Sequence, residues 1–507
     1  MSKVPDGLSS VFERFFAFER DSGLFSQEVC GVRFWHYIRF YIYSVLVLPS
    51  FVPMDAAHPD MHAKVGAKPP GGLGKRVLSK CHRVWRMFRM LVIGNPSFAL
   101  RRRDVLISLA PRTMSLDGGR RMRLAIDFFV ERLKSSWCVL ELPTAGSGYA
   151  VHDGSGRRFF WETVKRAICK YRASSGSKAQ LPEISAVAKR LSEEMSESLG
   201  IPVDEGVLRH RIESAVVLER AAVPLLRNWL RRLGVRCVVE VVHYCNANMA
   251  LTRAAHEEGL PVVELQHGTV YPAHVAYNLP VADSRCSPDY LLGWGDWWLR
   301  QTRNFPAKRA VPVGYPYLEH SLERFRCRTV RHGLVRVLFI SQGTAGRQLA
   351  EAAVQLSTML PNDRFPIVFK LHPNETIRWR ELYPCLLTSR VEVVENTARG
   401  VYECFAESDV TVGACSTALI EGFMWGLKAF IIKNLAGSDT MAPFCDGTMA
   451  QYVDGVDELA SALVATGESA GEMMASGCAE AFFKTGSAAA TSKIIDDFAC
   501  KRGEVLL

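Results

Sequence analysis

The chain has 507 residues, 48% of them hydrophobic, which is enough for sizeable cores in two or three domains. The formal net charge is +10, and the 14 cysteines include no Cys-x-x-Cys pair, which argues against a disulfide framework or a paired-cysteine zinc site. The N-terminus lacks a secretory signal pattern, and the apolar run 40–54 is too short to cross a bilayer, so a cytoplasmic protein is expected.

Residues 1–103 are predicted to form a helical, aromatic and basic N-terminal region. Residues 1–60 are rich in Phe, Trp and Tyr, which favours a packed helical cap over a cleft lining or a surface that dips into lipid. Residues 61–74 carry two prolines and four glycines, which is the composition of a linker.

A basic amphipathic helix is predicted from Lys75 to Ile93, with apolar residues at three-to-four spacing and Lys or Arg elsewhere. Between Met61 and Arg103 there is no Asp or Glu, while 11 residues are Lys or Arg. The pattern favours attachment of residues 75–103 to an anionic membrane surface, which would place the protein at the inner face of the cytoplasmic membrane. A solvated basic face is the alternative, and nucleic acid is not an expected partner.

Residues 104–317 are predicted to form a Rossmann-like domain. Strand, helix and strand alternate, which implies a parallel sheet with right-handed crossovers. Short apolar strands are expected at 105–109, 138–142, 237–243, 261–265 and 289–292, with helices at 121–134 and 246–258 and mostly helical structure over 150–235.

Residues 318–490 repeat this rhythm and are predicted to form a second Rossmann-like domain, followed by a C-terminal tail at 491–507. The fold class is therefore α/β, with two doubly wound domains in tandem. Strands are expected at 335–340, 367–371, 391–394, 410–413 and 429–432, with helices after the first strand and at 401–407, 418–425 and 457–464.

His372 is the most informative residue of the second half. It follows the apolar run Ile367–Leu371 and precedes Pro373, which stops a strand because it has no amide hydrogen. Ligands of open α/β sheets bind outside the carboxyl ends of strands, so His372, with Lys370 beside it, is a candidate phosphate contact. A histidine titrates near neutrality and can also protonate a departing phosphate.

Two other segments of this half carry phosphate-binding signals. Ser416 and Thr417 begin a predicted helix after an apolar strand, where backbone amides and the helix dipole favour anions. Glu421, about one turn later, can reach a ribose hydroxyl. Gln342, Gly343 and Thr344 follow another strand and offer further backbone amides.

In the first half, Gln266-His267-Gly268 ends a predicted strand and would face the acceptor side of an interdomain cleft. His267 is a candidate base, although a histidine simply packed at a strand end fits as well. Asp117 precedes Gly118 and Gly119 and could accept an acceptor proton, although a turn residue is the simpler interpretation.

Taken together, Lys370-Leu371-His372-Pro373, Ser416-Thr417 with Glu421, and Gln266-His267-Gly268 resemble bacterial capsule and surface-polysaccharide glycosyltransferases of the GT-B fold. That grouping includes sialyl- and Kdo-transferase-like enzymes and CDP-glycerol glycerophosphotransferases. The resemblance covers about residues 235–435.

The resemblance implies a nucleotide-activated donor on the second domain and an acceptor on the first. His372 would contact the donor phosphate, Ser416 and Thr417 would cap the phosphate-binding helix, and Glu421 would hold the nucleotide. The polysialyltransferase-like branch carries two acidic residues before a glycine, and Leu116-Asp117-Gly118 lacks the first. No metal and no cofactor are expected, and no Asp-x-Asp triplet occurs.

The sequence therefore predicts a peripheral-membrane glycosyltransferase of surface-polysaccharide assembly, acting on a glycan or lipid-linked acceptor. A nucleotide-sugar epimerase or hydrolase, or a glycerol-phosphate transferase, would use the same fold. A non-catalytic anion- or membrane-binding protein is the alternative from another class.

Overall fold

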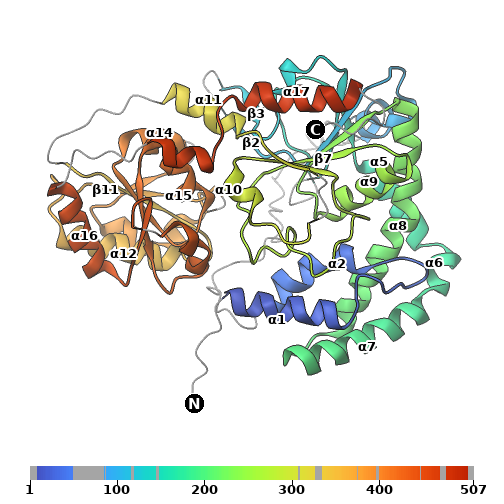
Figure 1. Ribbon diagram of the computed structural model, residues 1–507, viewed down its shortest axis with the longest axis horizontal. Helices are drawn as coiled ribbons and strands as arrows, with labels where there is room; N and C mark the ends of the chain where they lie inside the picture. Colours follow the sequence, from blue (N-terminus) through green and yellow to red (C-terminus); the bar gives the residue numbers. More distant parts are fainter. Residues whose placement is uncertain are drawn as a thin grey trace, which may run out of the picture. The chain divides into compact units, whose positions relative to one another are not determined.

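The computed structural model describes residues 8–48, 85, 87–115, 119–143, 148–305, 309–325, 334–373, 375–395, 399–445, 447–468 and 476–500. These residues fall into two compact units (Figure 1). The first domain comprises the described parts of 11–316 together with 486–500, and the second comprises those of 317–485 together with residues 8–10. Each contains one parallel sheet with helices, so the predicted α/β class is confirmed.

The first sheet has the strand order β5-β4-β1-β6-β7-β8-β9, and all of its described strands are parallel. The order reverses between β1 and β6, which is the topological switch point where open α/β sheets bind ligands. The strands are β1 (Val105–Leu109), β4 (Trp137–Glu141), β5 (Arg157–Phe160), β6 (Cys237–Val241), β7 (Val262–Leu265), β8 (Tyr290–Gly293) and β9 (Arg309–Pro312).

The second sheet has the order β12-β11-β10-β13-β14-β15, again parallel, with its switch point between β10 and β13. The central strands are buried throughout, as expected for a sheet covered on both faces. The strands are β10 (Val337–Ile340), β11 (Ile367–Lys370), β12 (Glu392–Val394), β13 (Val410–Gly413), β14 (Lys428–Ile432) and β15 (Ala450–Val453).

Helix α17 (Ser487–Cys500) belongs to the first domain (Figure 1, red). Its buried residues Ile495, Phe498 and Ala499 join the core formed by β1 and β6. The rings of Phe498 and Tyr290 lie 4.3 Å apart. The segment expected as a tail thus contains most of a helix that completes the first-domain core.

The other long helices follow the sequence pattern. In the first domain these are α5 (Glu162–Arg172), α7 (Leu181–Leu199), α8 (Glu205–Leu233) and α9 (Asn246–Glu257). In the second they are α12 (Gly346–Met359), α14 (Val401–Glu407) and α16 (Val456–Glu468). No helix in the described ranges is long and apolar enough to cross a bilayer.

Most aromatic residues of the N-terminal helices α1 (Leu8–Asp21) and α2 (Trp35–Tyr41) are packed inside the protein, as the cap interpretation predicts. Phe15 and Trp35 have no exposed surface. Arg39 of α2 forms a buried ion pair with Glu19 of α1, at 2.7 Å. Its guanidinium also donates to the backbone oxygen of Asn278, at 3.2 Å, and so ties the two helices to the loop after β7.

The prediction of a helix over residues 121–134 is wrong. Residues 113–115 and 121–123 form a two-stranded antiparallel ribbon (β2 and β3), followed by turns. The reason is a buried charge: the Nε of Arg123 donates to Asp127 at 2.7 Å, and its guanidinium donates to the Ser155 oxygen at 2.9 Å. These bonds engage the Nε and Nη2 of a fully buried guanidinium, and we infer that this buried ion pair outweighs the local helical pattern.

Candidate functional site

The residues predicted to contact the donor follow three adjacent strands of the second sheet. His372 follows β11, Gln342 to Thr344 follow β10, and Ser416 and Thr417 follow β13. The carboxyl ends of parallel strands meet at one edge, so these segments share one edge of the sheet. Two of them flank the switch point between β10 and β13.

Gln342 joins the two sides of that switch point. Its Nε2 donates to the Cys415 Sγ at 2.9 Å, and its Oε1 accepts the Cys415 backbone N–H at 3.2 Å. At the start of the following helix α12, a Cβ on Gly346 would lie 2.1 Å from the hydroxyl of the buried Tyr383, which favours glycine there. Gln342 therefore fixes the separation of two strand ends.

His372 and Lys370 have different environments. The His372 side chain is exposed, while its backbone N–H donates to the Glu375 carboxylate at 2.9 Å. Lys370 is only 3% exposed, and burial lowers the pKa of its ammonium to about 8. The exposed imidazole is thus placed to meet a ligand, whereas Lys370 is enclosed in the domain.

The second-domain helix α15 (Thr417–Glu421) holds the remaining donor-side residues. The Ser416 Oγ accepts the Ala418 N–H at 3.2 Å, which is the predicted N-cap. Glu421 is 8% exposed, and its Oε2 accepts the Tyr402 hydroxyl at 2.9 Å. Burial raises the pKa of Glu421 to about 7, against hydrogen bonds from Tyr402 and Thr417 that lower it. This carboxyl group is therefore held largely inside the domain.

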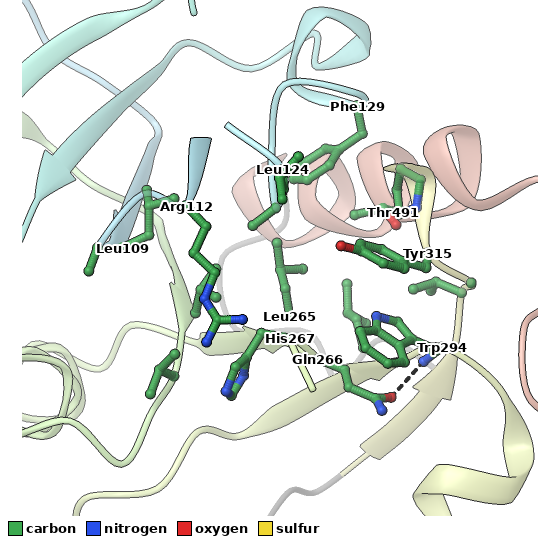
Figure 2. Close-up of a pocket in the computed structure, with 18 residues that line it drawn as sticks. Leu109, Arg112, Leu124, Phe129, Leu265, Gln266, His267, Trp294, Tyr315 and Thr491 are labelled. Carbon is green, nitrogen blue, oxygen red and sulfur yellow. Dashed lines mark hydrogen bonds between the residues drawn. The ribbon is translucent and has the colours of Figure 1, made fainter. Parts of the chain in front are cut away.

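The first domain has a pocket at the carboxyl edge of its sheet, beside the switch point between β1 and β6 (Figure 2). Its empty volume, including the open mouth, is about 730 Å³. It is lined by Leu109, Ala110, Arg112, Leu124, Ala125, Phe129, Val241, Val242, Leu265, Gln266, His267, Leu292, Trp294, Val313, Gly314, Tyr315, Pro316 and Thr491.

Gln266 and His267, two of the predicted acceptor-side residues, line this pocket. The Gln266 Oε1 accepts the Trp294 backbone N–H at 2.8 Å (Figure 2). The Gln266 Nε2 donates to the Gly268 oxygen at 2.9 Å. The His267 Nε2 lies 3.1 Å from the Tyr244 hydroxyl. Gln266 is thus a structural bridge between two strand ends, while His267 is the titratable group.

Behind His267 lies a buried carboxylate that the sequence analysis missed. The Glu264 Oε1 is 4.0 Å from the His267 Nδ1 and accepts the Tyr277 hydroxyl at 2.8 Å, and its Oε2 is 2.7 Å from the His243 Nδ1. Burial raises the pKa of Glu264, but His243, His267 and Tyr277 more than reverse this, so the group stays ionised. A charged residue inside a buried strand was the available signal.

Burial lowers the pKa of His267 to about 4, although Glu264 opposes this, and Arg112 lowers it further. Figure 2 shows the Arg112 side chain extending toward the imidazole. His267 is therefore neutral at physiological pH and can accept a proton.

The turn that presents His243 and Tyr244 is strained. Val242 has a φ of +66°, which is unusual for a β-branched residue. Asn248 holds this turn because its Nδ2 donates to the oxygens of Val241 and Val242, at 2.8 and 3.0 Å. Strain maintained by specific hydrogen bonds is typical of functional sites.

Asp117, the other candidate base, lies outside the described residues. Most of the predicted helix 75–93 is also outside them, and its described residues, 85 and 87–93, are helical. Within the described ranges, no group of three or more His, Cys, Asp or Glu residues is arranged to hold a metal ion.

No protein-family model matches the sequence, and no curated protein matches it. Among solved structures, the chain aligns with UDP-GlcNAc 2-epimerase from Neisseria meningitidis at 13% identity and a TM-score of 0.46, over 79% of this chain and 100% of the epimerase. It aligns with MurG from Acinetobacter baumannii at 14% identity and a TM-score of 0.44, over 78% and 99% of the two chains.

The wall teichoic acid polymerase TagF aligns at 10% identity and a TM-score of 0.44, over 84% of this chain and 95% of TagF. Similarities this distant do not identify a substrate or a reaction.

Proposed function

We propose that the protein is a glycosyltransferase that moves a sugar from a nucleotide-activated donor to a hydroxyl of a surface polysaccharide or lipid-linked glycan. The main observation behind this proposal is that each of the two parallel sheets has residues able to bind a ligand at its carboxyl edge. One edge carries His372, Gln342 and the Ser416 turn, and the other opens into the pocket with His267.

In this proposal the donor diphosphate binds at the second-domain edge. The backbone amides of Gly343 and Thr344 and the capped turn at Ser416 offer donors, and the exposed His372 imidazole contacts the phosphate and protonates it as it leaves. Catalysis is mainly positioning and electrostatic stabilisation of the departing phosphate. The donor is a substrate, and the proposal calls for no cofactor and no metal ion.

On the acceptor side, His267 takes the proton of the attacking hydroxyl. It is neutral, lies in the pocket wall and is backed by the ionised Glu264. Hydrolysis or epimerisation of the donor without any acceptor would instead favour the hydrolase or epimerase alternative.

A thermal-shift screen with CMP, CDP, UDP, GDP and dTDP tests the donor site, because a ligand that binds only the folded state stabilises it. We expect one nucleotide to raise the Tm, and His372→Ala to weaken its binding about ten- to a hundredfold, as for the loss of a charge-assisted hydrogen bond. The exposed His210 of α8 provides the matched control, since His210→Ala should bind normally. Equal binding by both variants would remove His372 from the donor site.

We also propose that the basic segment attaches the protein to the inner face of the cytoplasmic membrane. Trp85, Phe88 and Phe98 are 57%, 47% and 59% exposed, and the rings of Trp85 and Phe88 stack 5.8 Å apart. Exposed aromatic residues in a segment that has only basic charges suit an anionic lipid surface.

Changing both Trp85 and Phe88 to Ser is expected to abolish most co-sedimentation with vesicles of anionic phospholipid, because it removes the exposed apolar surface. The control is the pair Ile377→Ser and Leu387→Ser, which alters apolar residues of the second domain that are 91% and 54% exposed. Undiminished sedimentation of the Trp85/Phe88 variant would contradict attachment through this segment.

A further inference from the structure

We propose that the first-domain pocket binds an alkyl phosphate group, with its apolar chain in the interior and its phosphate at Arg112. The inference deepens the proposed function, on which it rests, by assigning the lipid end of the acceptor to this pocket. It is based on the apolar and charged residues that line the pocket.

The interior of the pocket is apolar. Leu124, Phe129, Leu265, Leu292 and Val313 contribute to its lining. The ring of Trp294 stacks on that of Tyr315, with centroids 4.8 Å apart and planes at 18°, and gives the pocket a flat aromatic side (Figure 2). Each CH₂ group moved from water into such a space contributes favourably to binding.

The polar groups of the pocket do not suit a buried sugar. Both ends of the Gln266 amide are already hydrogen-bonded to backbone groups. Thr491 adds a buried hydroxyl without a hydrogen-bond partner in the described part of the chain. The two hydroxyls among the lining residues, those of Thr491 and Tyr315, are fewer than the hydroxyls of a sugar ring, and each unpaired one would weaken binding.

The charge of the pocket favours an anion. Arg112 is exposed, and Figure 2 places its guanidinium beside His267. No carboxylate is among the lining residues, and Glu264 lies behind the imidazole rather than in the lining. A guanidinium suits the geometry of phosphate oxygens, so a phosphate attached to the apolar chain completes the site.

Isothermal titration of the full chain with n-octyl phosphate, below its micelle concentration and without any nucleotide, tests this inference. We expect saturable one-to-one binding, which Arg112→Gln weakens about ten- to a hundredfold. Arg132→Gln, a change of another exposed arginine of the same domain, should leave it unchanged. Ala125→Leu, which places extra atoms in the pocket, should also weaken binding.

Two further ligands test the contributions of the alkyl chain and of the phosphate group separately. Octanol and inorganic phosphate should each bind much more weakly than octyl phosphate. Equal affinity for inorganic phosphate, or unchanged octyl phosphate binding by both Arg112→Gln and Ala125→Leu, would overturn the inference. Because no donor is present, these outcomes are independent of the nucleotide screen that tests the proposed function.

Discussion

Replacing His267 with Asn is expected to lower kcat/KM for sugar transfer by about 10²–10⁴-fold, the usual contribution of a general base. The imidazole lies in the pocket wall, 3.1 Å from the Tyr244 hydroxyl and 4.0 Å from the Glu264 carboxylate. Asn keeps a polar group at this position but cannot accept a proton at neutral pH. Nucleotide affinity should not change, because His267 is in the first domain.

The pH dependence of wild-type kcat/KM gives a second measurement of the same role. The His267 pKa is lowered to about 4, so its neutral, proton-accepting form predominates above that pH. The acid limb of the profile should therefore lie well below the value of about 6.5 for an ordinary histidine. Tyr244→Phe, which removes the hydroxyl beside the Nε2, should change the rate less than His267→Asn.

Asp117→Asn is the comparison that decides between the two predicted bases. Full activity of His267→Asn together with loss of activity in Asp117→Asn would assign the base to Asp117. Loss of activity only in the His267 variant would assign it to the pocket histidine.

Replacing Arg39 with Met is expected to destabilise the first domain by about 3–5 kcal/mol, because it leaves the buried Glu19 carboxylate without its cation. The side chains of Arg39 and Glu19 are 4% and 0% exposed. The change also removes the donor to the Asn278 oxygen, which ties the N-terminal helices to the loop after β7. Chemical denaturation followed by tryptophan fluorescence measures the effect.

The exposed pair Arg303 and Glu13, whose side chains are 46% and 54% exposed, provides the control. Arg303→Met should cost no more than about 1 kcal/mol, as for other surface ion pairs. Equal and small losses for Arg39→Met and Arg303→Met would show that the buried pair does not hold the N-terminal helices in place.

The interior strands could be predicted from the sequence because a strand covered on both faces is mostly apolar along its whole length. β1, β6 and β10 are such strands, with all of their residues buried. Within the two parallel sheets, the strands without a prediction are β5, β9 and β15, and each forms the edge of a sheet. Edge strands are partly exposed and need no continuous apolar run, so they lack this signal.

The candidate site was predictable only where a residue lies within two positions of a strand end. His372, Gln342 and His267 are such residues, and the parallel order of the strands brings them to the sheet edges. The charged Glu264 inside an apolar strand was the one signal that the sequence offered for this cluster. Its contacts with His243 and Tyr277 were not predictable, because only the folded chain creates them. The place of Arg112 beside His267 was likewise not predictable, because the two residues follow different strands, β1 and β7, and come together only in the folded pocket.

Helix α17 has a consequence for the order of synthesis. β9 ends at Pro312, but Ile495 and Phe498, which pack in the same core as β1 and β6, are translated only after the whole second domain. At about 5–20 residues per second, this delay is roughly 10–35 s. During that time the second domain can fold completely, while the nascent first domain exposes an apolar gap. If translation stops after the second domain, the chain therefore has a complete second domain but a first domain that lacks α17, although the first domain was synthesised earlier.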